Sequence, residues 1–263
     1  FFGIFEFIRG SILTGFPWNL IAYSFSNHLE ILSITSFIGT YGFNLFCISL
    51  FTSPAVFILR DSKKDIWVCI VFLMMPLLFY MHGSSYKETF NTSDVISYNY
   101  KVRAIGSNIS LDRFYSNIDP ASAINDLIEI SEPNKNEKTI FVWPEGILPE
   151  ISQKELFEYK WLFEKSFNKN HLLLIGINNQ TINKESINYF NSLSIYDHNL
   201  ELLNFYNKVN LVPFGEFLPF ENISKAFGLR SITNNYQSFS KGNKREIMEI
   251  NREGFSIKIL PLI

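Results

Sequence analysis

The glutamate at position 145 has a setting that suits catalysis. It lies in the run Trp-Pro-Glu-Gly at 143–146, directly after the apolar stretch 138–143. We expect that stretch to be a short buried strand that Pro144 ends. Glu145 would then stand at the carboxyl end of a strand, where the active sites of α/β sheets gather. Desolvation among apolar neighbours should raise its pKa and suit it to general-base catalysis. The alternative is a solvated glutamate in a loop.

A lysine and a second glutamate follow about sixty residues later, in the segment 206–219, which is rich in Pro, Gly and aromatic residues. Lys208 ends an apolar strand, and Glu216 stands in a loop between two prolines. An ammonium group that points into a closed site can stabilise a developing oxyanion. The alternative is a surface lysine beside a structural turn, and the residues alone leave both possibilities open.

The elements that must position these side chains belong to a mixed α/β domain. Helices should follow the N-cap at 119–120 and the capping box at 152–155. Apolar runs of strand length lie at 101–107, 138–143, 171–177, 189–197, 200–206 and 255–260. The pair 189–197 and 200–206 should form a hairpin, because its connection has turn composition. A hairpin that interrupts the alternation of strands and helices favours a layered mixed sheet over a purely parallel one.

The amino-terminal third has the pattern of membrane helices. The stretches 31–59 and 66–86 contain no charged residue. Each is long enough to cross a bilayer, which takes about 20 apolar residues, and neither has a polar face for water to wet. The alternative is a pair of buried helices in a soluble protein. Because the short connector 60–65 is rich in Lys and Arg, the positive-inside rule places it in the cytoplasm and the domain after it on the outer side.

Composition excludes several classes of function. Hydrophobic residues make up 47% of the 263, and charged residues only 18%, against roughly 25% in average chains. That balance excludes a disordered chain, and the net charge of −2 excludes a nucleic-acid module that works through excess positive charge. Two cysteines exclude a disulfide scaffold and a cysteine-rich metal site. We therefore expect neither a nucleic-acid partner nor a bound metal.

Taken together, these runs resemble one family. The Trp-Pro-Glu-Gly run and the segment 206–219 are similar to motifs of the nitrilase superfamily. The runs at 6–10 and 13–19 (Leu-Thr-Gly-Phe-Pro-Trp-Asn), followed by membrane helices, narrow the resemblance to the apolipoprotein N-acyltransferases. The resemblance covers almost the whole chain. It implies transmembrane helices in residues 1–86, followed in residues 87–263 by a nitrilase-like α-β-β-α sandwich that is incomplete at its carboxyl end. We expect the sequence to be a fragment truncated at both ends.

The resemblance also implies a catalytic Glu, Lys and Cys. Glu145 matches the base, Lys208 the residue that steadies the oxyanion, and Glu216 a further essential glutamate that orients the lysine or the nucleophile. The family's nucleophile follows a strand like 255–263, so we expect a cysteine directly after Ile263. Cys47 and Cys69 lie in the expected membrane helices and should be small apolar side chains.

The implied reaction moves an acyl chain in two steps. The thiol attacks an ester of a phospholipid, the acyl donor, and leaves a thioester. The N-terminal amine of a diacylglyceryl apolipoprotein, the acceptor, then takes the acyl chain. No metal or organic cofactor is needed. The resemblance places a monomer in the bacterial inner membrane as a multi-pass protein, with its catalytic domain on the periplasmic side.

Two other functions stay open. A membrane-tethered nitrilase-type amidase would hydrolyse a small amide with the same residues. A non-catalytic membrane scaffold could retain the nitrilase fold. A further hypothesis concerns the apolar residues around 214–227, which could dip into the outer leaflet as a lid; the alternative is ordinary core packing. The six residues concerned are Phe214, Phe217, Leu218, Phe220, Ile223 and Phe227.

Overall fold

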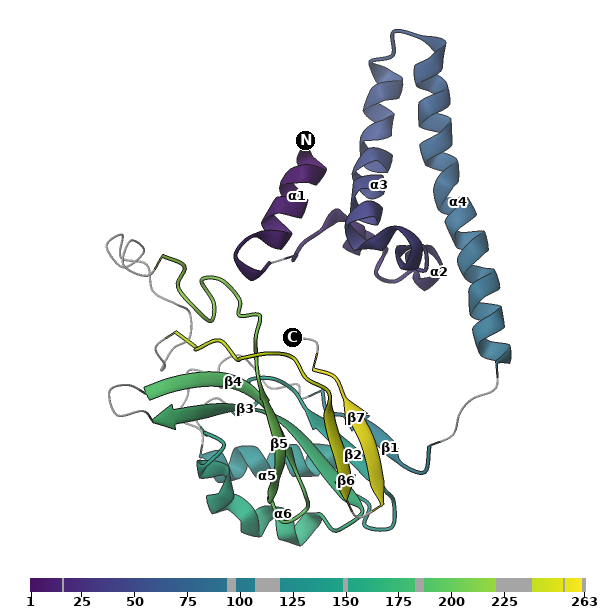
Figure 1. The fold of residues 1–263 in the computed structure, drawn as a ribbon. Helices are drawn as coiled ribbons and strands as arrows, with labels where there is room; N and C mark the ends of the chain where they lie inside the picture. The colour runs from purple at the N-terminus through teal and green to yellow at the C-terminus, as the bar shows by residue number, and fades with distance from the viewer. Residues whose placement is uncertain are drawn as a thin grey trace. The chain divides into compact units, whose positions relative to one another are not determined.

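The computed structural model describes residues 1–15, 17–93, 98–106, 119–148, 151–182, 187–220, 238–252 and 254–261. The chain forms two compact units, Phe1–Ile96 and Ser97–Ile263 (Figure 1). The first is helical, and the second holds all the described strands.

The helical unit is built around two long helices. Its elements are α1 (Phe2–Ser11), η1 (Ile12–Thr14), η2 (Ile21–Phe25), α2 (Leu29–Leu32), α3 (Thr35–Ile58) and α4 (Lys63–Thr92). A capping box between Ser62 and Asp65 begins α4. Phe43 and Phe46 of α3 lie at the centre of the core and contact Phe79 of α4. The two uncharged stretches predicted as helices are therefore helices that pack on each other.

Helices α3 and α4 are long and apolar enough to cross a membrane. They have 24 and 30 residues, and their most apolar 18-residue windows have mean hydropathies of 1.5 and 2.0. Only 33% and 17% of these windows are buried inside the protein. Most of each window is therefore apolar surface that the described residues leave exposed.

The second unit contains a five-stranded sheet of mixed direction. Its spatial order is β1 (Lys101–Ala104), β2 (Thr139–Trp143), β3 (His171–Ile182), β4 (Ile187–Tyr196) and β5 (Leu202–Asn207). The first three strands run parallel, and β4 and β5 continue as an antiparallel hairpin. A separate hairpin pairs β6 (Met248–Arg252) with β7 (Phe255–Ile259). The mixed α/β fold and the hairpin predicted from the sequence are confirmed.

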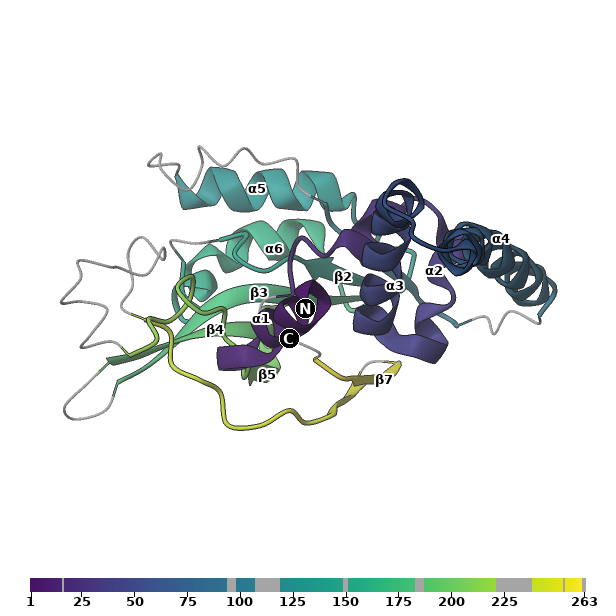
Figure 2. The same cartoon turned by 90° about the horizontal axis from the view of Figure 1, so that it is seen from above.

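The main sheet is buried on both faces. Helices α5 (Pro120–Ser131) and α6 (Lys160–Ser166) cover one face, and the β6–β7 sheet covers the other (Figures 1 and 2). Alternate residues of β3 enter the two cores, with Leu173 under the helices and Leu172 under the small sheet. This double burial explains why β2 and β3 have continuous apolar runs. The described residues form three layers, so the four-layered α-β-β-α sandwich stays a prediction.

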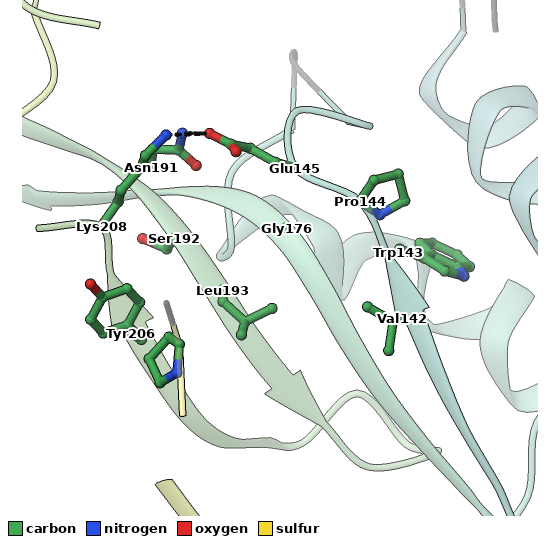
Figure 3. A pocket seen from close by; sticks show the side chains of 11 residues that line it. Val142, Trp143, Pro144, Glu145, Gly176, Asn191, Ser192, Leu193, Tyr206 and Lys208 are labelled. Atoms are coloured by element: carbon green, nitrogen blue, oxygen red, sulfur yellow. Dashed lines mark hydrogen bonds and ion pairs between the residues drawn. The ribbon is translucent and has the colours of Figure 1, made fainter. Parts of the chain in front are cut away.

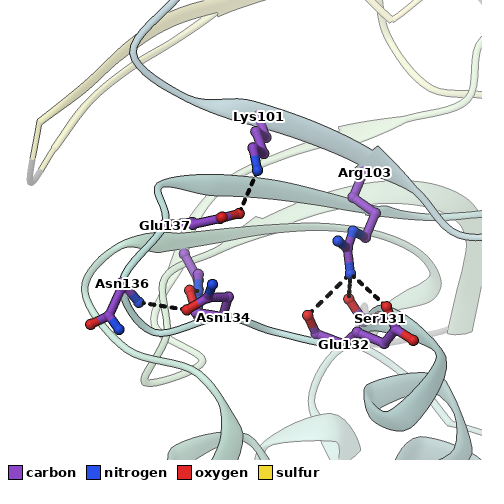
Figure 4. Close-up of polar contacts among 8 residues, drawn as sticks. Lys101, Arg103, Ser131, Glu132, Asn134, Asn136 and Glu137 are labelled. Carbon is purple, nitrogen blue, oxygen red and sulfur yellow. Dashed lines mark hydrogen bonds and ion pairs between the residues drawn. The ribbon is translucent and has the colours of Figure 1, made fainter.

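Both ends of α5 are tied down. Asp119 caps its start by accepting from the backbone N–H groups of residues 121 and 122. At its end, Arg103 Nη1 of β1 donates to the carbonyl oxygens of Ser131 (2.7 Å) and Glu132 (3.1 Å), which have no partner within the helix (Figure 4). Trp143 Nε1, at the end of β2, donates to Ser131 Oγ (2.9 Å). The carboxyl end of β2, where the Glu145 loop begins, is thereby fixed to α5.

Candidate active site

Glu145 stands where the sequence places it, two residues after the end of β2. Its loop passes unusually close to β3 at Gly176. A Cβ atom at Gly176 would lie 2.6 Å from Glu145 Cα and 2.8 Å from Pro144 O. Only glycine leaves room for the loop to cross the strand there. The glutamate is thus held by backbone packing rather than in a free loop.

Lys208 and Glu216 are held by the backbone around them. Lys208 follows β5, and its N–H donates to Asn191 O on the neighbouring strand β4 (2.8 Å). Glu216 closes a tight loop in which its Oε2 accepts from Val212 N (2.7 Å) and its N–H donates to Val212 O (2.8 Å). The side chains of Lys208 and Glu216 are only 9% and 11% exposed. Burial excludes the solvated surface lysine considered above.

The three predicted side chains converge. Lys208 Nζ lies 2.9 Å from Glu145 Oε1 and 3.1 Å from Glu216 Oε1. Figure 3 shows the tips of Lys208 and Glu145 pointing toward each other from separate elements. The structure thus brings together residues that are 63 positions apart in the chain. It gives one ammonium group between two carboxylates; their catalytic roles stay predictions.

A fourth residue, Asn191 of β4, belongs to the same cluster and is missed from the sequence. Its Nδ2 donates to Glu145 Oε1, and also to Glu216 Oε1 at 2.6 Å. One signal was available, because asparagine is uncommon inside strands and Asn191 interrupts the predicted strand 189–197. An unusual residue in a strand does not reveal its partners, and here the partners Glu145 and Glu216 lie in loops distant in the chain.

The cluster sets the charge of its members. Burial alone would raise the pKa of the Glu145 carboxyl, but hydrogen bonding and charge from Lys208, with the Asn191 amide, hold that pKa below its ordinary value. The raised pKa expected from the sequence is therefore wrong. Burial alone would lower the pKa of Lys208, but Glu145 and Glu216 raise it. At neutral pH the site holds an ionised Glu145 beside an ammonium group, so Glu145 can accept a proton.

A cavity of about 220 Å³ opens beside the cluster. Glu145, Asn191 and Lys208 form its polar part, and most of the remaining lining is apolar (Figure 3). Pro261 also lines it, two residues after the end of β7. The last described strand therefore leads into the cavity that Glu145 and Lys208 line.

Neither cysteine of the chain lies in the unit that holds this cluster. Cys47 is in α3 and Cys69 is in α4, and both are buried. Cys69 Sγ donates to Ser53 O (3.0 Å). Among the described residues, no group of three or more His, Cys, Asp or Glu side chains is placed to hold a metal ion.

Comparisons with known proteins agree with the resemblance seen in the sequence. Residues 1–51 match the family model of the apolipoprotein N-acyltransferase N-terminal domain. The chain is 25% identical over 268 residues to the apolipoprotein N-acyltransferase of Rhodopseudomonas palustris, a match covering 98% of this chain and 49% of the relative. The enzyme of the same name from Bradyrhizobium diazoefficiens is 24% identical over 253 residues, covering 92% and 47%. Over nearly its whole length, the chain is similar to proteins named apolipoprotein N-acyltransferase.

The relationship extends beyond the amino-terminal motifs. Both alignments run through the α/β unit, so the recognition based on residues 6–19 and 206–219 is confirmed. The chain spans about half the length of the curated apolipoprotein N-acyltransferases it matches. A solved amidase of the nitrilase superfamily, from Nesterenkonia sp. AN1, covers 61% of this chain and 52% of its own, with 13% identity and a TM-score of 0.25. A similarity of that size carries no conclusion about the fold.

Proposed function

We propose that this chain carries part of the catalytic site of an apolipoprotein N-acyltransferase. This activity moves an acyl chain from a phospholipid to the N-terminal amine of a diacylglyceryl-cysteine lipoprotein. One observation carries the proposal: in a relative of these enzymes, Lys208 Nζ lies between the carboxylates of Glu145 and Glu216 at the edge of a mostly apolar cavity. A buried ammonium and an ionised carboxylate at one cavity suit acyl transfer through a covalent intermediate.

Each residue of the cluster has a distinct task in this reaction. Glu145 takes the proton of a thiol, whose sulfur attacks the ester carbonyl of the phospholipid. Lys208 donates to the oxyanion that forms on that carbonyl oxygen. Glu216, fixed by Val212 N, holds the ammonium group in place. The proton passes to the departing lysophospholipid, and the acyl chain stays on sulfur as a thioester. The acceptor amine then attacks the thioester carbonyl, the C–S bond breaks, and the amine's proton passes through Glu145 to the departing sulfur, which leaves an amide and the free thiol.

The thiol is proposed to belong to a cysteine that follows Ile263. Pro261 supports this proposal, because it brings the end of the β6–β7 hairpin to the cavity that Glu145 and Lys208 line. The codons after Ile263 in the encoding gene test it directly. A cysteine there agrees with the enzyme, and another residue would favour the non-catalytic scaffold.

Lipid substrates give a reason for the helical unit to lie in a membrane. We propose that residues 1–86 are part of a multi-pass transmembrane domain and residues 87–263 part of a nitrilase-like domain on the periplasmic side of the bacterial inner membrane. The low burial of α3 and α4 supports spanning, and three basic residues in the connector 60–65 support a cytoplasmic location for that turn. Because donor and acceptor are both lipids, a monomer held at the bilayer surface could reach both.

We also propose that the aromatic residues around Glu216 form a lid that contacts the bilayer. Phe214 and Phe220 are 47% and 73% exposed, whereas Leu218 is buried. Phe214 and Phe220 also have φ values of 62° and 50°, in the left-handed region that bulky residues rarely adopt. Exposed aromatic side chains beside the cluster support contact with lipid. Ile223 and Phe227 lie outside the described residues.

The test uses the protein encoded by the complete gene, purified in detergent. Transfer from phospholipid to a diacylated lipopeptide is measured beside hydrolysis of a small amide. We expect transfer without amide hydrolysis, and a loss of about a hundredfold or more in Glu145→Gln, because removing a general base typically lowers rates 10²–10⁴-fold. Glu249→Gln is the matched control, since Glu249 pairs with Lys258 on the exposed side of β6–β7. Amide hydrolysis without transfer would support the tethered amidase, and full transfer by Glu145→Gln would reject the assigned base.

A further inference from the structure

Asn191 is bonded to both carboxylates of the cluster, although no sequence motif includes it. Its Nδ2 carries two hydrogens, and the two bonds from that nitrogen go to Glu145 Oε1 and Glu216 Oε1. Lys208 Nζ donates to the same two oxygen atoms. The four side chains therefore form a closed ring in which an amide and an ammonium alternate with two carboxylates.

The charges of this ring explain why an amide is needed. Two carboxyl groups share one ammonium group, so the formal charges of the ring leave one negative charge in excess. Like charges at such distances disfavour ionisation of both carboxyls. Hydrogen bonds donated to a carboxylate favour its ionised form, and a primary amide supplies two of them without adding a charge. Asn191 is also joined to Lys208 through the backbone, where Asn191 O accepts from Lys208 N at 2.8 Å.

The ring also orients Glu145. The donors that the structure records for its carboxylate, Lys208 Nζ and Asn191 Nδ2, both bind Oε1. Because neither of these two donors uses Oε2, that oxygen is the one we expect to receive a proton from a reacting group. Without Asn191, the carboxylate would lose one of the two nitrogen donors on Oε1, and the flexible side chain of Lys208 would be the other.

We propose that Asn191 is a positioning residue of this site, whose amide nitrogen bridges Glu145 and Glu216, holds Glu145 by Oε1 and so directs Oε2 to the nucleophile. The role in acyl transfer rests on the function proposed above. The bridge itself can be tested without any activity.

The sharpest variant is Asn191→Asp, which keeps the shape of the side chain but replaces the double donor with a third carboxyl group. Transfer is measured between pH 4 and pH 9 on the complete protein, with kcat and KM separated. We expect the acid limb of kcat to move up by about one pH unit or more, because the added acid, in place of a donor, raises the pKa of the Glu145 carboxyl. The matched control is Asn188→Asp, on the same strand, whose Oδ1 accepts a hydrogen bond from Ser240 Oγ, outside the cluster.

A second variant and a second measurement keep the proposal testable if Asn191→Asp folds poorly. Asn191→Ser is too short to bridge both carboxylates and should move the acid limb in the same direction by a smaller amount. The unfolding midpoint is followed against pH for all variants by tryptophan fluorescence. The acid loss of stability should begin at higher pH in both Asn191 variants and not in Asn188→Asp.

The outcomes separate the two proposals. An unmodified protein without transfer activity would reject the proposed function, and the unfolding curves alone would then decide about Asn191. An acid limb or unfolding curve of the Asn191 variants that matches the unmodified protein would overturn the positioning role. A fall in activity with an unchanged acid limb would also overturn it, because a merely structural residue would produce that result.

Discussion

Replacing Lys208 with methionine should destabilise the α/β unit far more than removing an exposed ion pair. Methionine keeps much of the aliphatic stem and removes the charge. Glu216 would then be a buried carboxylate without its ammonium partner, beside Glu145. The variant therefore isolates the electrostatic contribution of one nitrogen atom to the folded state.

The exposures of the two carboxylates set the magnitude. Lys208 and Glu216 are 9% and 11% exposed, and breaking a buried ion pair by removing one partner costs about 3–5 kcal/mol. Glu145 is 47% exposed, so solvent screens its share, and pairs of that kind contribute about 0–1 kcal/mol. Because Asn191 still donates to both carboxylates, we expect the low end of the buried range, about 3 kcal/mol at neutral pH.

The assay is denaturant unfolding of the purified protein at pH 7 and again at about pH 4, where an ordinary glutamate is near its pKa. The loss should shrink at the lower pH, because protonation removes the unpaired charges that the variant creates. Lys101→Met is the matched control, since its pair with Glu137 is exposed on β1, and it should leave the unfolding midpoint nearly unchanged because solvent screens exposed pairs. A loss below about 1 kcal/mol for Lys208→Met, or an equal loss at both pH values, would refute the reasoning.

Three further predictions follow from the same geometry. The pKa of Glu145 is lowered from 4.5 and that of Lys208 is raised from 10.5. The contribution of this pair to the free energy of unfolding should therefore be complete between pH 4.5 and pH 10.5, and should be lost as the pH falls through the Glu145 pKa or rises through the Lys208 pKa. An alkaline loss of stability that persists in Lys208→Met would contradict this. Gly176→Ala should lower the free energy of unfolding by about 2 kcal/mol or more, because the added methyl group overpacks against the Glu145 loop. Gly106→Ala is the control, since open space surrounds Gly106, and it should cost less than about 0.5 kcal/mol. Both values are measured by denaturant unfolding. Replacing Phe220 with Ser should lower lipid turnover without loss of folding, which circular dichroism follows. Unchanged turnover would reject the lid hypothesis.

Local patterns determined most of the elements. The apolar stretches form α3, α4, β2 and β3. The two long runs are helices and the two short buried runs are strands, as their lengths predict. The strand β6 was missed, since its five residues alternate apolar side chains with polar and charged ones and gain stability only by covering the main sheet. The predicted strand 171–177 extends to Ile182, because β4 pairs with its polar end.

The sequence by itself determined which residues are chemically capable, and the run at 143–146 and the segment 206–219 marked Glu145, Lys208 and Glu216. Only the tertiary structure decided which partners those side chains have and in which direction their pKa values move. The direction of the Glu145 pKa depends on an amide from β4 and an ammonium after β5, which lie 46 and 63 positions away in the chain. Electrostatic energies depend on distances in space, and a sequence records distance only along the chain.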